Sequence, residues 1–389
     1  ATAAPVSYAD RGPYAVGQVD LEVDPERRVA VFYPVGADAV PADAEPYTYS
    51  GDTIFGPELS GLLPGALAAE ISPPDTWVGL PASGDGPFPV VLHSHGAAGN
   101  LRFANLHNTH TASWGHVVVV VDHPERGVAA AFAALGQAEG DEEPDFSDSF
   151  LDTDQLLEGL ELALAQADDP DSPLAGALDG TRVAAEGHSA GGSASGAAAY
   201  DERIALWIGQ APSPPVPPET DVEAYLTEEE DDDGDVEIQV DVAAVYEDAE
   251  PPAVTSLVIA AEGDTIIDLD ERVVPAYEWL ASPKRLAVIA DSGHAVFVDP
   301  CLNILEEGGL SAFVETLGFD PDDVDLIELG ENGCLPTDTS AEEIWPLIDH
   351  LTVAQLEETF GDEAVGSDWL GEDFLNETFP GLLAELRTG

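Results

Sequence analysis

Basic residues are almost absent from this chain of 389 residues. It has 11 Lys and Arg residues, of which Lys284 is the only lysine, against 77 Asp and Glu residues, for a formal net charge of −66. Such a chain would be repelled by nucleic acids and by anionic membrane surfaces. We therefore expect neither of these as a partner.

Long hydrophobic runs are also missing. The longest apolar runs, such as residues 117–121, have the length of buried strands and fall far short of the roughly 18 residues that a membrane-spanning helix needs. The hydrophobic content of 44% is enough for a sizeable core. A single domain over residues 1–389 with no membrane span is the expectation.

The charge balance predicts adaptation to salt. In dilute salt the excess of negative charges repels itself and strains the compact state. Molar salt shortens the Debye length to about 3 Å and removes most of that repulsion. We expect a halophilic or marine protein, with a melting temperature that rises by several degrees between low and molar NaCl. A melting temperature that does not rise would leave only an acidic secreted protein.

Cysteine is scarce and methionine is absent. Cys301 and Cys334 lie in one loop-rich stretch, and the chain opens with ATAAPVS, which resembles a mature end left after removal of a signal segment. We expect a secreted protein in which the two cysteines form a disulfide that stabilises the fold by about 3 kcal/mol. Two reduced thiols are the alternative.

The hydrophobic pattern alternates between short apolar runs and longer helical segments. Strands are expected at 15–35 (an antiparallel pair), 88–95, 116–123, 181–186, 204–208, 254–261 and 285–290. Helices are expected at 58–70, 101–114, 152–167, 189–200, 271–280 and 341–360. This alternation predicts an α/β protein with a mainly parallel sheet, helices on both faces and chemistry at the carboxyl ends of the strands.

Two segments depart from this alternation. Residues 211–250 are rich in proline and acidic residues and are expected to form a solvated insertion, with a lid over the site as a further interpretation. Calcium binding there is a weaker alternative. If Gly234, which follows a run of acidic residues, is the glycine at position 6 of an EF-hand loop, then position 12 is Val240, where the loop needs Glu. Residues 301–389 form a C-terminal extension that contains both cysteines.

Residues 187–191 carry the pattern G-x-S-x-G of a nucleophile elbow, which is a sharp strand-to-helix turn. The pentapeptide follows a short β run and opens a helix of small residues. Gly187 and Gly191 let strand and helix approach, and His188 precedes the serine. We predict that Ser189 is a catalytic nucleophile, placed at the helix N-terminus.

A serine hydroxyl needs a base to become a strong nucleophile. In proteins with this elbow the order along the chain is Ser, then Asp or Glu, then His. Two histidines follow Ser189: His294 in DSGHAVF lies just past the last expected strand, and His350 lies on a helical pattern. We predict His294 as the base and a packing role for His350.

The acid that orients the base should lie in the loop after the preceding strand. That strand runs into EGDTIIDLDE, where Asp264 follows Gly263 in an expected tight turn. We predict Asp264 as the acid. Asp268 and Asp270 are alternatives that suit the start of the next helix better, and Glu262 is a further alternative.

Two backbone N–H groups should stabilise the oxyanion that forms during acyl transfer. Ala190 follows the nucleophile, and Ala97 lies in the loop HSHGAAGN after an earlier strand. His93 and His95 in that loop form an H-x-H pair typical of metal sites, but no further ligand has matching spacing. We expect no metal and no cofactor.

Five segments carry a resemblance to a known superfamily. They are HSHG (93–96), ASWGHVVVVVDHPERG (112–127), PLAGALDGTRVAAEGHSAGG (173–192), AAEGDTI (260–266) and DSGHAVF (291–297). Together they resemble the α/β-hydrolase superfamily, and in particular bacterial dienelactone-hydrolase-like proteins and platelet-activating-factor acetylhydrolases. The segments at 260–266 and 291–297 are also similar to the acid and base segments of actinobacterial cutinases and polyester hydrolases.

The resemblance implies that Ser189, Asp264 and His294 form a triad, that Ala97 and Ala190 form the oxyanion hole, and that no cofactor takes part. Members of these families hydrolyse short-chain esters, oxidised or short-chain phospholipids, or polyesters. True dienelactone hydrolases use a cysteine nucleophile, which argues against that activity here. Polyester-degrading cutinases carry an aromatic residue where this chain has Ala97, so polyester cleavage is the less favoured expectation.

These observations predict a monomeric serine carboxylesterase that hydrolyses neutral, short-chain esters, either small or polymeric. A polyester hydrolase and a short-chain phospholipid acetylhydrolase are alternatives, and a peptidase would be separated by comparing amides with esters. A catalytically inactive binding module is the alternative from another class. Such modules usually lose a member of the triad, and this chain keeps all three.

Overall fold

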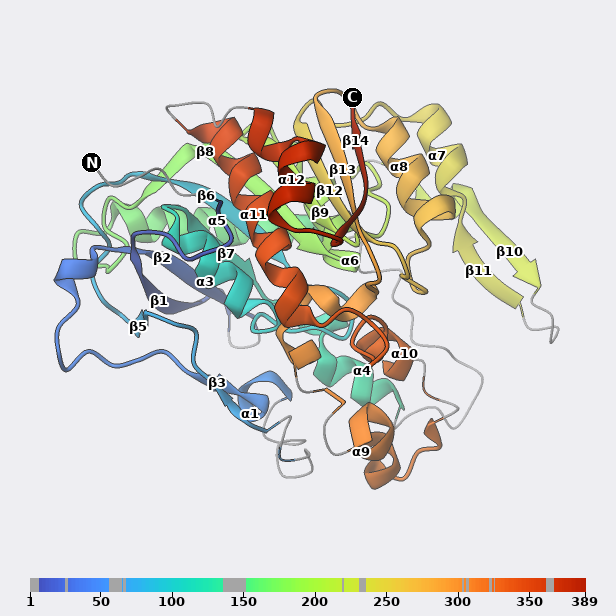
Figure 1. Ribbon diagram of the computed structural model, residues 1–389, viewed down its shortest axis with the longest axis horizontal. Coiled ribbons are helices and arrows are strands. Elements are labelled where there is room, and N and C mark those ends of the chain that lie inside the picture. The colour runs from blue at the N-terminus through green and yellow to red at the C-terminus, as the bar shows by residue number, and fades with distance from the viewer. Residues whose placement is uncertain are drawn as a thin grey trace.

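The computed structural model describes residues 7–24, 27–55, 65, 68–135, 152–218, 220–230, 236–302, 304–305, 308–321, 324, 326–361 and 367–389. The helix expected at 58–70 lies largely outside these residues, and so does Gly234 of the calcium alternative. A ten-stranded sheet runs through the centre of the molecule (Figure 1).

The central sheet is mixed but mostly parallel. Its strands lie side by side in the order β14-β13-β12-β9-β8-β6-β7-β2-β1-β5, and the six from β13 to β7 all run in the same direction. In chain order the strands are β1 (Ala15–Glu22), β2 (Arg28–Val35), β5 (Thr76–Val78), β6 (Phe88–Ser94), β7 (Val117–Val121), β8 (Leu178–His188), β9 (Ile204–Gln210), β12 (Thr255–Ala261), β13 (Lys284–Ile289) and β14 (Leu383–Thr388).

Helices cover both faces of the sheet, because alternate residues of each buried strand point to opposite sides. In β7, Val118 and Val120 belong to one core and Val119 to the other. The helices α3 (Asn105–Ser113), α11 (Ala341–Phe360) and α12 (Glu372–Thr378) pack on the first side, and α5 (Asp152–Asp168), α6 (Ala190–Ala198) and α8 (Val274–Trp279) pack on the second. The expected α/β class is confirmed.

Shorter elements lie around the sheet. They are α1 (Gly51–Phe55), β3 (Tyr49–Ser50), β4 (Glu70–Ile71), α4 (Val128–Leu135), β10 (Leu226–Glu230), β11 (Val236–Val240), α7 (Val242–Asp248), α9 (Gly309–Leu317) and α10 (Leu326–Glu331). The acidic insertion contains an antiparallel hairpin of β10 and β11, which the sequence did not predict. In Figure 1 this hairpin projects from the side of the molecule, away from α9 and α10.

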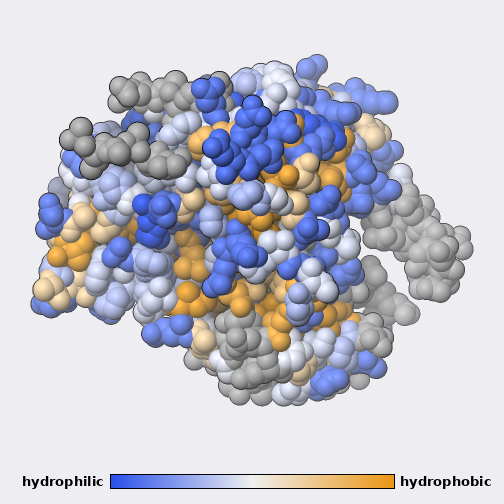
Figure 2. Space-filling view, in the orientation of Figure 1, coloured by the Kyte–Doolittle hydropathy of each residue, from blue (hydrophilic) through white to orange (hydrophobic). Residues whose placement is uncertain are grey.

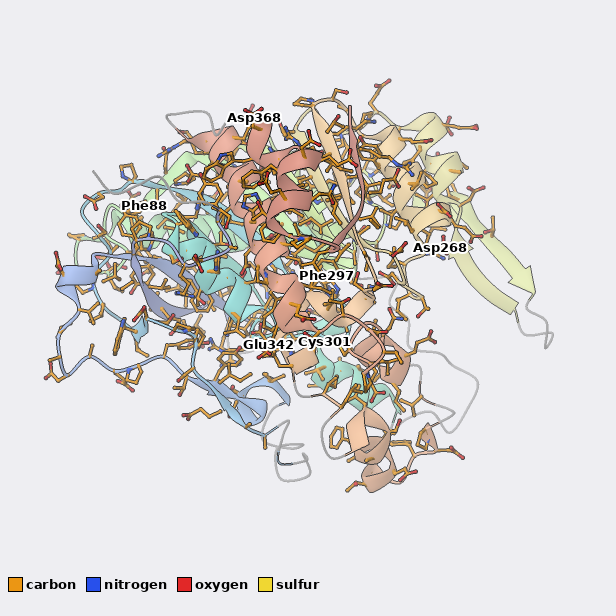
Figure 3. The ribbon with its side chains drawn as sticks, in the orientation of Figure 1. Phe88, Asp268, Phe297, Cys301, Glu342 and Asp368 are labelled. Carbon is orange, nitrogen blue, oxygen red and sulfur yellow. A yellow bond between two sulfur atoms is a disulfide. The ribbon has the colours of Figure 1, made fainter. Side chains whose placement is uncertain are left out.

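The C-terminal extension is built into the body of the protein. Helix α11 packs on the sheet, and β14 pairs antiparallel with β13 at the sheet edge. The expected disulfide between Cys301 and Cys334 is confirmed, with an S–S distance of 2.06 Å. In Figure 3, Phe297 and Cys301 lie close to the first turn of α11, where Glu342 is labelled. The extension therefore reaches the loop that carries His294.

Much of the face shown in Figure 2 is hydrophilic, with apolar patches in between. The single lysine of the chain is used for internal contacts. Lys284, the only lysine, donates from Nζ to the carbonyl oxygens of Tyr277, Glu278 and Leu280 at 2.8 to 2.9 Å, at the end of α8. No helix in the described part of the chain is long and apolar enough to cross a membrane.

Candidate active site

Ser189 lies on the sharp turn between β8 and α6. Its backbone has φ 55° and ψ −124°, a strained conformation for a residue with a side chain. Three hydrogen bonds hold the turn: its N–H donates to Gln210 O at 3.0 Å, and its carbonyl oxygen accepts from Gly192 at 2.8 Å and Ser213 at 2.9 Å. The predicted nucleophile elbow is therefore present in the backbone.

Two glycines make this turn sterically feasible. A Cβ on Gly187 would lie 2.0 Å from the carbonyl oxygen of Gly191, and a Cβ on Gly191 would lie 2.1 Å from that of Ser94. Distances this short exclude every side chain, so strand β8, helix α6 and the end of β6 can meet only through glycine.

His294 and Asp264 are in direct contact at the carboxyl ends of neighbouring parallel strands. Asp264 follows β12, His294 follows β13, and His294 Nδ1 lies 2.8 Å from Asp264 Oδ2. The other oxygen of Asp264 accepts hydrogen bonds from the N–H groups of Ile266 at 2.9 Å and Ile267 at 2.8 Å. Both side chains are buried, so the carboxylate is fixed in place and in turn fixes the imidazole.

The alternative acids are used elsewhere. Asp268 accepts from the N–H of Glu271 at 2.7 Å and caps the helical turn before α8. Glu262 accepts from the N–H of Asp291 at 3.2 Å. Asp268 is labelled in Figure 3 well away from Phe297. Phe297 lies on the loop that carries His294, which we call the base loop. The structure therefore brings Asp264, rather than these rivals, to His294.

His294 and Ser189 line the same cavity. Within the described residues, the buried Nε2 atom has no hydrogen-bond partner. When Nδ1–H of the neutral ring donates a hydrogen bond to the carboxylate, Nε2 carries a lone pair and can accept a proton. In an unliganded site such a hydrogen bond is often formed only when the substrate binds.

Two backbone N–H groups are available for an oxyanion. Ala190 is the first residue of α6, and the Ala97 N–H lies in the loop after β6; neither donates to an acceptor within the described chain. The neighbouring Ala98 N–H is occupied, because it donates to Arg126 O at 2.8 Å. This arrangement agrees with the two donors chosen from the sequence.

Arg126 supports the loop that carries Ala97. It is buried, pairs with Asp152, donates to His95 O, and donates to Ser94 Oγ at 2.8 Å. Its guanidinium therefore links Asp152 to the end of β6, just before the loop that carries Ala97. No pattern in the sequence predicts this role.

Both histidines of the H-x-H pair have partners within the protein. His93 Nδ1 lies 3.2 Å from Glu186, while His95 Nδ1 donates to Gly96 O at 2.8 Å and its Nε2 accepts from His123 N–H at 3.1 Å. Burial lowers the pKa of His95. The described residues contain no group of three potential metal ligands. Both histidines are bound within the protein, as structural residues would be.

His188 lies beside the predicted base. Its Nε2–H donates to the carbonyl oxygen of His294 at 2.9 Å, and the two rings are 4.8 Å apart. Burial, together with the nearby His294, holds the pKa of His188 well below its usual range. His188 is therefore neutral at pH 7 and anchors the base loop without adding a positive charge.

His350, the other histidine after the elbow, is far from this chemistry. It lies buried in α11, where its Nδ1 accepts from the N–H of Tyr8 at 3.0 Å and its Nε2–H donates to Trp369 O at 3.0 Å. Burial lowers the pKa of His350. It is a packing residue, as expected.

Ser189 and His294 lie at the polar end of a cavity with about 680 Å³ of empty space, its open mouth included. The remaining wall is almost entirely apolar and is formed largely by residues 295–330. No described residue of 211–250 lines this cavity. Among the described residues, the C-terminal extension is thus the segment that borders the site, and a lid formed by residues 211–250 stays a prediction.

Asn332 is a site residue that sequence reasoning missed. Its Oδ1 accepts from the N–H of His294 at 2.6 Å, its carbonyl oxygen accepts from Ala295 at 2.7 Å, and its Nδ2 donates to Gly263 O at 3.3 Å. The Asn332 side chain therefore links the base loop to the turn that carries Asp264. The only local signal is an Asn-Gly pair, typical of a turn.

Gly333, which follows Asn332, lies in direct backbone contact with Gly293, next to His294. A Cβ on Gly293 would lie 2.5 Å from the Gly333 nitrogen, and one on Gly333 would lie 2.5 Å from the Gly293 Cα. Gly333 also has φ 88°, which a side chain disfavours. The extension and the base loop thus meet backbone to backbone, one residue before Cys334.

Asn332→Ala is expected to lower kcat about 10- to 10²-fold with little change in KM, because a displaced base loop misplaces His294 relative to Ser189. Asn332→Asp, which keeps an oxygen for the His294 N–H, should recover part of kcat. Steady-state kinetics with a chromogenic ester would measure both. The exposed Asn376 in α12 offers the matched control, Asn376→Ala. An unchanged kcat in Asn332→Ala would rule out a positioning role.

Neither a protein-family model nor a curated protein matches this chain.

Proposed function

We propose that this protein is a serine carboxylesterase of the α/β-hydrolase superfamily. The observation that carries the proposal is the environment of His294, whose Nδ1 lies 2.8 Å from Asp264, whose Nε2 has no hydrogen-bond partner among the described residues, and which lines one cavity together with Ser189. The strand-to-helix turn at Ser189 and the chain order Ser, Asp, His support the superfamily.

The proposed reaction proceeds through an acyl-enzyme. Ser189 Oγ attacks the ester carbonyl carbon while His294 Nε2 takes the hydroxyl proton, and the Ala97 and Ala190 N–H groups stabilise the oxyanion. The protonated His294 then gives its proton to the leaving alcohol. A water molecule attacks the acyl-enzyme with His294 again as base, which releases the acid and restores Ser189. Asp264 remains ionised and stabilises the protonated imidazole.

Neutral substrates fit the charge of the molecule. A net charge of −66 repels anionic esters at a distance, and among the described residues no Asp, Glu, Lys or Arg side chain lines the cavity. Short-chain neutral carboxylic esters are therefore the proposed substrates. Export from the cell is part of the proposal and is supported by the disulfide between Cys301 and Cys334.

The test is hydrolysis of p-nitrophenyl esters from acetate to palmitate, in low and in molar NaCl, beside a p-nitroanilide of a short acid. We expect turnover of the shorter esters, with higher activity in molar NaCl and far slower cleavage of the anilide. Faster cleavage of the anilide would indicate a peptidase. Folded protein, verified by circular dichroism, that turns over no ester at either salt concentration would contradict the proposal and favour a binding module.

A further inference from the structure

The apolar part of the cavity wall comes from one segment of the chain. Leu310 lies on α9, and Leu326 and Leu329 lie three residues apart on α10, so that the latter two share one face of the helix. Val298 and Ile304, which precede these helices, complete this wall. We call these five residues the aliphatic wall.

The aliphatic wall is held in a fixed position. Ile304 and Leu310 pack with Phe313 into a small core of their own, against which Cys334 also packs. The Leu310 N–H donates to the side chain of Glu331 at 2.6 Å. A Cβ on Gly330 would lie 2.6 Å from Leu310 Cδ1, so α10 lies directly on that leucine. The wall is thus a built surface rather than a loop resting on the site.

Other apolar lining residues belong to the main domain. Phe103, which precedes α3, and Val128, which begins α4, also line the cavity, as does Ala97 in the loop after β6. In Figure 1, α4, α9 and α10 lie together at one end of the molecule. The main domain and the extension therefore both contribute apolar residues to the cavity.

The polar groups of the cavity are concentrated at one end. Ser189, His188 and His294 are the lining residues with polar side chains, and none of the lining side chains is acidic, lysine or arginine. A ligand that fits has one polar, uncharged group for the serine and an extended apolar arm. Ligand pockets commonly have this division between an apolar lining and a few placed polar groups.

We infer that the aliphatic wall is a binding site for the unbranched aliphatic arm of a neutral ester, on either its acyl or its alcohol side. The inference rests on the proposed function for the identity of the ester group. The arm would lie between the aliphatic wall and Phe103, with the carbonyl carbon at Ser189. The C-terminal extension would then determine chain-length preference.

Binding is measured with Ser189→Ala, so that no turnover is needed. Methyl butyrate, methyl hexanoate and methyl octanoate would be titrated and followed by NMR, beside octyl acetate. Affinity is expected to rise by up to about fourfold for each methylene that is buried. Tight binding of methyl octanoate alone assigns the arm to the acyl side, and tight binding of octyl acetate alone assigns it to the alcohol side.

The aliphatic wall is tested by tryptophan substitutions that fill the space beside it. In the Ser189→Ala background, Leu329→Trp and, as a second variant, Leu326→Trp should abolish the gain in affinity from butyrate to octanoate. Leu335 lies in the same extension, is 43% exposed and does not line the cavity, so Leu335→Trp is the matched control and should bind as the parent does. Melting temperatures verify that each variant is folded.

The two proposals fail in different ways. Affinity that does not depend on chain length, or that is unchanged in both folded tryptophan variants, would overturn the aliphatic site even if the wild-type protein hydrolyses esters. Chain-length-dependent binding that Leu329→Trp removes would support the site even if the wild-type protein hydrolyses no ester, in which case the proposed catalytic function alone fails.

Discussion

Ser189→Ala is expected to lower kcat toward a p-nitrophenyl ester by about 10⁶-fold without unfolding the protein. The hydroxyl supplies the only nucleophile in the proposed reaction, and its removal leaves the oxyanion donors and the cavity unchanged. A residual rate of about 10³- to 10⁴-fold over water is expected from these alone. Pre-steady-state bursts of p-nitrophenol should disappear with the acyl-enzyme.

A serine in the same helix provides the control. Ser193 lies in α6, where its hydroxyl donates to Pro214 O at 3.1 Å, and it does not line the cavity. Ser193→Ala should therefore keep most of the activity and lose only the modest stability of one hydrogen bond. Ester hydrolysis by Ser189→Ala close to the wild-type rate would show that another group is the nucleophile.

Glu186→Gln is expected to destabilise the fold by about 3–5 kcal/mol, although Glu186 does not line the cavity. The carboxylate is completely buried in β8 and accepts hydrogen bonds from His93 at 3.2 Å, His107 at 3.1 Å and Gln210 at 2.9 Å. His107 Nδ1 donates in turn to Asp349 at 2.7 Å. Neutralising Glu186 removes the main counter-charge of a buried cation.

The charges of this network follow from its geometry. Burial alone would lower the pKa of His107, but the Glu186 carboxylate and the hydrogen bond to Asp349 raise the pKa to about 10. Burial alone would raise the pKa of Glu186, but the protonated His107 and the hydrogen bonds from both histidines hold that pKa well below its usual range. The pair is therefore ionised at pH 7.

An ion pair at the protein surface provides the control for the predicted effect of Glu186→Gln. Glu161 pairs with Arg203, and its side chain is 65% exposed, so Glu161→Gln should cost less than about 1 kcal/mol. Urea unfolding of both variants at one molar NaCl concentration would measure the difference. Equal and small losses in the two variants would show that the Glu186 network adds nothing to stability.

The same network predicts a pH dependence. A pKa of His107 raised to about 10 in the folded protein, against about 6.5 in the unfolded chain, means that its stabilising effect is complete below pH 6.5 and is lost as the pH rises through 10. The wild-type melting temperature should fall between about pH 7 and pH 10. The fall should be smaller in Glu186→Gln, because the pKa of His107 is then no longer raised by a carboxylate on β8.

The parts of the site that can be predicted from the sequence are those determined by residues close by in the chain. A nucleophile elbow needs its glycines within two residues of the serine, and here both Gly187 and Gly191 are in steric contact with backbone. The predicted acid and base follow the carboxyl ends of neighbouring parallel strands, which bring Asp264 and His294 into contact. Short apolar runs with turn residues after them predict both positions.

The parts that the sequence does not predict depend on contacts between distant segments. Glu186 stands in an apolar strand, and its partners come from β6, α3 and β9, which no spacing along the chain reveals. Asn332 reaches His294 across 38 positions. Strand β14 has few buried side chains, so its edge pairing with β13 leaves no strong hydrophobic pattern in the sequence.

The backbone contact between Gly293 and Gly333 restricts how molecules enter and leave the site. A covering segment that opened at this joint would pull the base loop with it and separate His294 from Asp264, so opening and catalytic competence would exclude each other. In the proposed esterase, substrate and product would therefore pass through the mouth of the cavity while the extension stays in place. A proteolytic cut within the extension would then inactivate the protein rather than uncover it.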